Sequence, residues 1–128
     1  MSQSYSDLEI YQQSYDLFLA THRFSMQLPK HEKYELGSQV RRSADSVNSN
    51  IVEGYGRRRY KREFIRYLVF SQASNDETIN HLKKVGDLYP QFAQEAGILE
   101  QRYIILGKQL NRFIQYVIQH WKTQPTSP

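Results

Sequence analysis

The residues with the most distinctive chemistry lie in one run, from Asn48 to Arg62. Side-chain hydrogen-bonding groups come first, Gly54 and Gly56 follow, and five cations then occupy six consecutive positions. Arginine and lysine neutralise phosphate groups, and an interleaved tyrosine offers a flat ring on which an unpaired base can stack. The run therefore predicts a surface that binds nucleic acid.

A structural role for the same cations is also open. A helix that ends near Glu53 carries partial negative charge at its C-terminus, and nearby arginines would stabilise it by a few tenths to about 1 kcal/mol. This interpretation is favoured for a single copy, whereas a symmetric ring would gather the clusters on one surface and strengthen the case for nucleic acid. The candidate nucleic-acid-binding residues are Arg41, Arg42, Arg57, Arg58, Arg59, Lys61, Arg62 and Arg66.

Asn50 and Glu53 are three residues apart, on one helix face beside an apolar stripe. A buried polar group is costly unless it is paired, so we expect these two side chains to build a structural network rather than to bind a ligand. The predicted members of the network are Asn50, Glu53, Ser74 and Glu77, and Arg41 or Arg42 are the alternative partners of Asn50 and Glu53.

The sequence offers no visible carrier of catalysis. The four histidines have no pair at the three- or four-residue spacing with which one helix presents two metal ligands, and cysteine is absent. There is no Gly-x-Ser-x-Gly nucleophile motif, and the later Gly and Lys-Ser/Thr of a phosphate-binding loop are missing after Gly54. We predict a protein that is not an enzyme and has neither metal nor cofactor.

Two internal prolines, Pro29 and Pro90, and the glycine pair at 54 and 56 divide the chain into four segments with helical periodicity. The first begins with a Ser-x-x-Glu capping box at Ser6 and follows a stripe of Leu8, Tyr11, Tyr15, Phe18 and His22. Gly54 is expected to end the second in a left-handed conformation. The predicted helices cover about 7–26, 36–53, 61–89 and 96–121.

The apolar stripes of the later segments are regular. They are Leu36, Val40, Ala44, Val47 and Ile51 in the second, Phe64, Leu68, Ser71, Asn75, Ile79, Leu82 and Val85 in the third, and Leu99, Leu106, Leu110, Phe113, Val117 and Trp121 in the fourth. Short loops between such helices predict an all-α, antiparallel up-down-up-down four-helix bundle. We expect one domain over 1–122 and a short flexible tail over 123–128. Tyr67, Val69 and Phe70 lie off the main stripe, where self-association would cover them.

Basic residues are concentrated in one part of the chain. Residues 41–66 hold eight basic and three acidic residues, whereas the rest of the 128-residue chain holds nine basic and ten acidic ones. The excess positive charge is therefore local. The sequence has no apolar run near the roughly 20 residues needed to cross a bilayer and no secretion signal, so we expect a cytoplasmic protein.

Several blocks together resemble one known family. They are Gln39-Val40-Arg41-Arg42, Asn50-Ile51-Val52-Glu53-Gly54, Arg57-Arg58-Arg59, Glu63-Phe64 and Ala73-Ser74-Asn75-Asp76-Glu77. Their order and spacing over nearly the whole chain are similar to those of the four-helix bundle proteins called 23S rRNA intervening-sequence proteins or S23 ribosomal proteins. Ala73 stands where that pattern usually has Gly. Tyr60 replaces a Ser or Thr, which deprives the third helix of an N-cap.

The resemblance implies a homopentameric ring, encoded in some bacteria within insertions of the large ribosomal RNA gene. A similar pentameric bundle, the accessory variability protein of diversity-generating retroelements, binds a reverse transcriptase and nucleic acid through a basic surface. By analogy our first hypothesis is an oligomeric nucleic-acid-binding protein, with RNA favoured over DNA. The second is a protein-interaction scaffold, such as an accessory subunit of a reverse transcriptase or another nucleic-acid enzyme.

Overall fold

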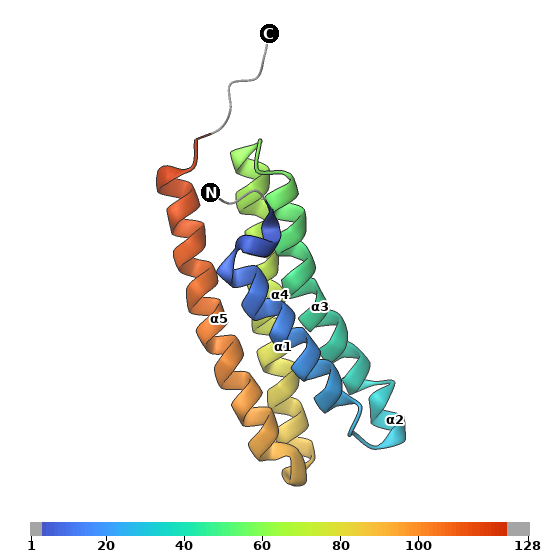
Figure 1. Ribbon diagram of the computed structural model, residues 1–128. Helices are drawn as coiled ribbons and strands as arrows, with labels where there is room; N and C mark the ends of the chain where they lie inside the picture. Colours follow the sequence, from blue (N-terminus) through green and yellow to red (C-terminus); the bar gives the residue numbers. More distant parts are fainter. Residues whose placement is uncertain (1–3, 123–128) are drawn as a thin grey trace.

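The computed structural model describes residues 4–122, and nearly all of them lie in helices (Figure 1). In chain order the elements are the 3₁₀ turn η1 (Tyr5–Asp7), α1 (Glu9–Ser25), α2 (Lys30–Lys33), α3 (Leu36–Gly56), α4 (Lys61–Leu88), the 3₁₀ turn η2 (Pro90–Phe92) and α5 (Ala93–His120). No strand occurs among these residues, so the all-α fold class is confirmed. No helix of the described part is long and apolar enough to cross a membrane. The predicted tail, 123–128, lies outside the described residues.

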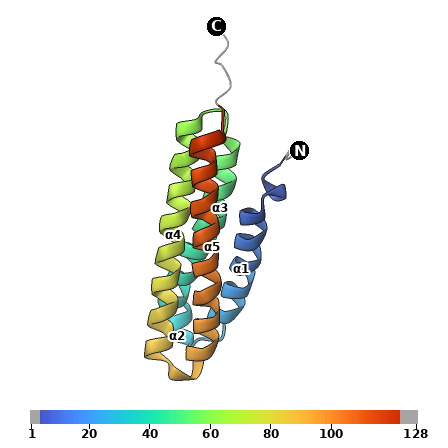
Figure 2. The same ribbon diagram turned by 90° about the vertical axis from the view of Figure 1, so that its left-hand side faces the viewer.

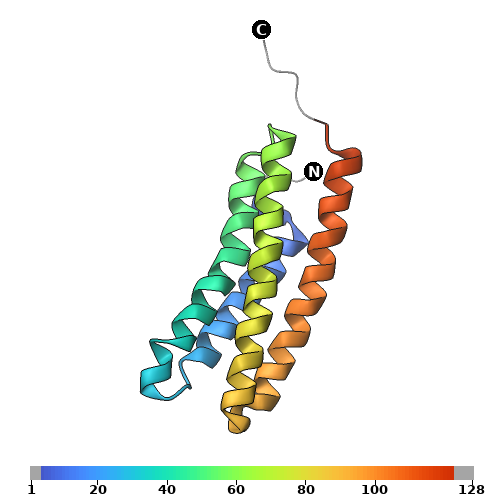
Figure 3. The same ribbon diagram turned by 180° about the vertical axis from the view of Figure 1, so that it is seen from behind.

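Four long helices, α1, α3, α4 and α5, form the body of the molecule (Figures 1 and 2). The tight turn between α3 and α4 lies at one end, and η2 joins α4 to α5 at the other (Figure 3). The C-terminus of α5 returns to the end that holds the α3–α4 turn (Figure 3). Residues about 60 positions apart in the sequence therefore meet at that end.

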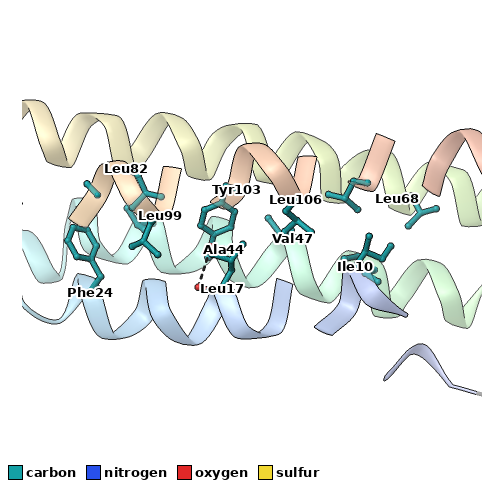
Figure 4. Packing of buried hydrophobic residues seen from close by; sticks show 14 of the residues in the cluster. Ile10, Leu17, Phe24, Ala44, Val47, Leu68, Leu82, Leu99, Tyr103 and Leu106 are labelled. Carbon is teal, nitrogen blue, oxygen red and sulfur yellow. Dashed lines mark hydrogen bonds between the residues drawn. The ribbon is translucent and has the colours of Figure 1, made fainter. Parts of the chain in front are cut away.

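One hydrophobic core runs along the four long helices (Figure 4). The stripe of α3 is fully buried, as predicted, and so are the apolar positions Phe64, Leu68, Leu82 and Val85 of α4. In α5 the predicted stripe is buried except for Phe113 and Trp121, which are partly buried against the core. Helical periodicity therefore locates the core correctly in three of the four helices.

The predicted stripe of α1 is only partly right: Leu8, Tyr11 and Phe18 are partly buried against the core, but Tyr15 and His22 are exposed. This helix buries Ile10, Leu17 and Phe24, whereas Tyr15 is 45% exposed. The buried stripe has the same helical spacing as the predicted one, so spacing alone could not separate the two. The aromatic side chains of the other stripe pack on one another at the surface, with the Tyr11 and Tyr15 ring centroids 5.8 Å apart. The buried stripe is completed by Ser14 and Thr21, whose hydroxyls find partners inside the bundle.

A polar layer crosses the middle of the core. Ser71 Oγ donates to the Val47 carbonyl at 2.6 Å, and Asn75 Nδ2 donates to the Tyr103 carbonyl at 2.8 Å. The Tyr103 hydroxyl is 2.7 Å from Thr21 Oγ1, and burial raises the pKa of Tyr103 to about 12. The polar positions of the α4 stripe thus link α4 to α3 and α5 through hydrogen bonds, as a buried polar group requires.

The predicted capping box does not form. Leu8 is the residue before α1 and makes no side-chain cap, while Ser6 belongs to η1, where its backbone N–H donates to Ser4 Oγ at 3.2 Å. The first helix begins at Glu9, two residues later than expected. The last helix begins at Ala93, three residues earlier than expected, because η2 leads directly into it.

Gly54 has a different role from the predicted one. No glycine among the described residues has a positive φ, and α3 continues past Gly54 to Gly56. Gly54 lies where α3 and α4 approach each other closely. A Cβ atom at this position would be 3.1 Å from the Tyr67 Cβ and 3.3 Å from the Phe64 carbonyl oxygen. The glycine therefore permits helix contact rather than helix termination.

We expect Gly54→Val to lower the free energy of unfolding by about 1–3 kcal/mol, because the added side chain must displace the backbone of α4. Urea denaturation followed by circular dichroism would measure the change. Gly97→Val in α5 is the matched control, since a Cβ there would meet nothing within 4 Å. Equal stability of the two variants would contradict the close-approach role of Gly54.

Candidate nucleic-acid interface

The basic turn, defined here as residues 57–62, joins α3 to α4. The Arg57 backbone N–H donates to the carbonyls of Glu53 and Gly54, which closes the last turn of α3. The residue before α4 is Tyr60, which makes no side-chain cap, as its replacement of Ser or Thr predicts. The turn is short, so its cations are held next to two helix ends.

Two cations of the basic turn stabilise helix C-termini. Arg58 Nη1 donates to the Tyr55 carbonyl at 2.9 Å, and its guanidinium carbon lies 4.1 Å from the centroid of the Tyr55 ring. Lys61 Nζ donates to the Ile118 carbonyl in the last turn of α5 at 2.7 Å. Each positive group neutralises the partial negative charge of a helix end. The structural interpretation therefore applies to Arg58 and Lys61.

Arg57 and Arg66 take part in a surface ion-pair network. Arg57 Nε donates to Glu53 at 3.2 Å, and its Nη1 is 3.5 Å from Glu63. The pKa of Arg57 is raised, mainly by its hydrogen bond to Glu53 and next by its charge interaction with Tyr67. Arg66 Nη1 lies 3.6 Å from the other oxygen of Glu63. Exposed ion pairs contribute little to stability because solvent screens them, so a phosphate can replace these carboxylates at little cost.

Arg59 and Arg62 are the unengaged cations of the turn. Both side chains are exposed, and neither makes a hydrogen bond or an ion pair with any residue that the structure describes. A charge without an internal partner is fully available to a ligand. These two arginines are therefore the strongest candidates for phosphate contacts.

Arg41 and Arg42 do not belong to this interface. Arg41 Nη1 donates to Ser25 Oγ at 2.9 Å and Nη2 to the Lys33 carbonyl at 2.8 Å, which ties α1 and α2 to α3. Arg42 is exposed on α3 near the same end. Sixteen residues of helix separate Arg41 from Arg57, or about 24 Å at 1.5 Å per residue. The eight predicted cations thus divide into six at one end of the molecule and two toward the other.

The predicted polar network is only partly right. Asn50 Nδ2 donates to Ser46 Oγ at 2.9 Å, and Ser46 Oγ is 2.7 Å from Ser74 Oγ, so Asn50 and Ser74 are joined through Ser46. Glu53 and Glu77 are outside it, with side chains 58% and 59% exposed. Their longer side chains reach solvent and pair with residues four positions later, Arg57 and His81. The missed signal was Ser46, one helical turn before Asn50.

An open depression of about 350 Å³ lies beside the basic turn, lined by Gly56, Arg58, Arg59, Trp121 and Lys122. Trp121 follows the last turn of α5, and its Nε1 donates to the Arg58 carbonyl at 3.1 Å. Its indole meets the Phe64 ring edge to face, with centroids 5.0 Å apart. Sequence reasoning placed Trp121 in the core stripe and did not associate it with the cations, because 60 residues separate it from Lys61.

Metal chemistry has no obvious centre in residues 4–122, which contain no group of three His, Asp or Glu side chains that could hold a metal ion. The side chains at this end of the bundle offer positive charge and an aromatic ring. They include exposed guanidinium groups, a lysine and a fixed indole around one depression.

Comparison with known proteins places the fold and this interface in context. No curated protein matches the chain significantly. A family model described as 23S rRNA-intervening sequence protein matches residues 6–112, from η1 into α5, and so includes the whole basic turn. The match extends over well more than half of the chain, and the protein therefore belongs to the family of 23S rRNA-intervening sequence proteins.

Proposed function

We propose that this protein is a non-enzymatic, oligomeric nucleic-acid-binding protein that contacts phosphate groups through the basic turn. The observation that carries the proposal is the pair of exposed arginines, Arg59 and Arg62, which no described residue neutralises. Arg58 and Lys61 are held beside them by helix-end carbonyls and add to the local field. RNA is favoured over DNA, in agreement with the reference to 23S rRNA in the family description.

Assembly would multiply this charge. We propose an antiparallel up-down-up-down bundle that forms a homopentameric ring in the cytoplasm, with one basic turn from each subunit. Val69 and Phe70 on α4 are 44% and 41% exposed, which supports a subunit contact along this helix. In a symmetric ring equivalent surfaces face the same way, so the basic turns would together attract a polyanion.

A second candidate function is that of a protein-interaction scaffold, such as an accessory subunit of a reverse transcriptase or another nucleic-acid enzyme. The observation that favours it is the Arg66 guanidinium, which lies 5.4 Å from the centroid of the exposed Phe70 ring. An exposed aromatic ring beside an arginine is typical of protein interfaces. Such a surface would suit an acidic protein partner.

Size-exclusion chromatography with light scattering tests the proposed function, with and without nuclease treatment and with absorbance ratios recorded. We expect a mass of several subunits, and nucleic acid in the untreated sample that nuclease removes. Purified protein should then bind single-stranded RNA with an affinity that falls steeply as salt rises. Absence of RNA binding at low salt would reject the first candidate and leave the scaffold.

A further inference from the structure

We infer that the depression beside the basic turn is a docking site for one nucleotide of single-stranded RNA. In this arrangement Arg59 and Lys122 bind a phosphate, and the base stacks against Trp121. The inference rests on the proposed function and adds to it a defined subsite and a preference for unpaired strands. The depression brings together the C-terminal end of α3, the basic turn and the end of α5.

Size and composition suit this ligand. A volume of about 350 Å³ lies at the lower end of the range of ligand pockets, roughly 300–1,000 Å³, which fits a single nucleotide unit. Three of the five lining residues are cations, and no carboxylate lines the depression. Arg58 is held by its hydrogen bond to the Tyr55 carbonyl, whereas Arg59 and Lys122 are exposed and make no hydrogen bond with a described residue, so they can reorient toward a phosphate.

Trp121 is held in place before any ligand arrives. Its Nε1 donates to the Arg58 carbonyl, and its ring packs against the buried Phe64. A fixed ring loses little conformational entropy when a base stacks on it, so the interaction retains most of its energy. A base stacks on an aromatic side chain through its flat face, and in a duplex these faces are covered by the neighbouring bases of the stack. The subsite therefore selects single strands.

Gly56 supplies an independent observation. Its φ is not positive, and a Cβ atom at this position would meet nothing within 4 Å. Neither a positive φ nor packing within the subunit requires a glycine at this last residue of α3. Gly56 lines the depression, so the absence of a side chain there leaves space for a ligand.

Trp121 is the single tryptophan of the chain, so its fluorescence reports directly on the depression. We expect an oligouridylate of about 12 nucleotides to quench tryptophan emission as it binds, because a stacked base quenches an indole. A duplex of the same length and inorganic phosphate should leave the emission nearly unchanged. A response to phosphate alone as large as that to RNA would overturn the assignment of a base to this site.

Gly56→Leu tests the site without removing a charge. We expect the variant to fold as stably as wild type and to bind the oligouridylate roughly 5- to 150-fold more weakly, the range for loss of one stacked base. Gly97→Leu is the matched control, since a Cβ there also meets nothing within 4 Å. Fluorescence anisotropy of labelled RNA measures binding independently of Trp121.

The outcomes separate this inference from the proposed function. RNA that binds by anisotropy without a change in tryptophan emission would overturn the docking site and leave the nucleic-acid function standing. Unaltered RNA affinity in Gly56→Leu would do the same. Failure of wild-type protein to bind RNA by anisotropy would reject both proposals together.

Discussion

Replacing Arg59 and Arg62 together with glutamine is expected to weaken binding of single-stranded RNA roughly 25-fold per subunit at about 0.1 M salt. The estimate follows from counterion release, in which each lost phosphate contact on a single strand reduces the slope of log K against log salt by about 0.7. The slope of the double variant should therefore be shallower by about 1.4. Anisotropy titrations of labelled oligouridylate at several salt concentrations measure both quantities.

The matched control is the double variant Lys83→Gln and Lys84→Gln. These lysines are also exposed neighbours without a described partner, but they lie near the C-terminal end of α4, far from the basic turn. Removing the same number of charges there should change the slope little. If both double variants lost affinity equally, RNA would be responding to net charge alone, and the localised interface would be wrong.

The choice of Arg59 and Arg62 depends on contacts that the structure provides. From the sequence alone, Arg57 and Arg58 are equally good candidates for phosphate contacts. Arg58, however, caps the Tyr55 carbonyl, and Arg57 bridges Glu53 and Glu63. A variant that removed all four arginines would alter the end of α3 as well as its charge, so weaker binding would have two explanations.

The sequence predicted most of the fold because helical spacing is a local property. The stripe of α3 is one run of apolar or small residues with mostly polar residues elsewhere, so only one face of this helix can be buried. In α1 two stripes compete, and the buried one contains Ser14 and Thr21. Their burial depends on hydrogen-bond partners such as the Tyr103 hydroxyl, which lies 82 residues away from Thr21 and which local spacing cannot locate.

Some features of the candidate interface could likewise be predicted from the sequence, whereas others depend on how the helices pack. A continuous run of cations is visible in the sequence, and pairs four positions apart on one helix, such as Glu53 with Arg57, follow from helical geometry. The bonds of Arg41 to Ser25 and to the Lys33 carbonyl depend on how α1 and α2 pack on α3. The position of Trp121 beside Arg58 depends on where α5 ends. Both are consequences of tertiary structure.

Phe64→Ala is expected to lower the free energy of unfolding by about 3–5 kcal/mol, the largest stability effect that we predict. Phe64 is fully buried at the first turn of α4. Its ring centroid lies 6.1 Å from that of Tyr55, 5.9 Å from that of Phe113 and 5.0 Å from that of Trp121. Truncation leaves a cavity among the rings of Tyr55, Phe113 and Trp121, which urea denaturation would detect as a lower midpoint.

Tyr34→Ala is the control, because this tyrosine lies between α2 and α3 and is 68% exposed. Its truncation leaves no enclosed cavity, so the loss of stability should be well below that of Phe64→Ala. Phe64 also supports Trp121, whose indole contacts Phe64 and the Arg58 carbonyl. At temperatures where Phe64→Ala remains folded, its tryptophan emission should shift toward that of a solvated indole. Unchanged emission would mean that the Arg58 carbonyl alone fixes Trp121.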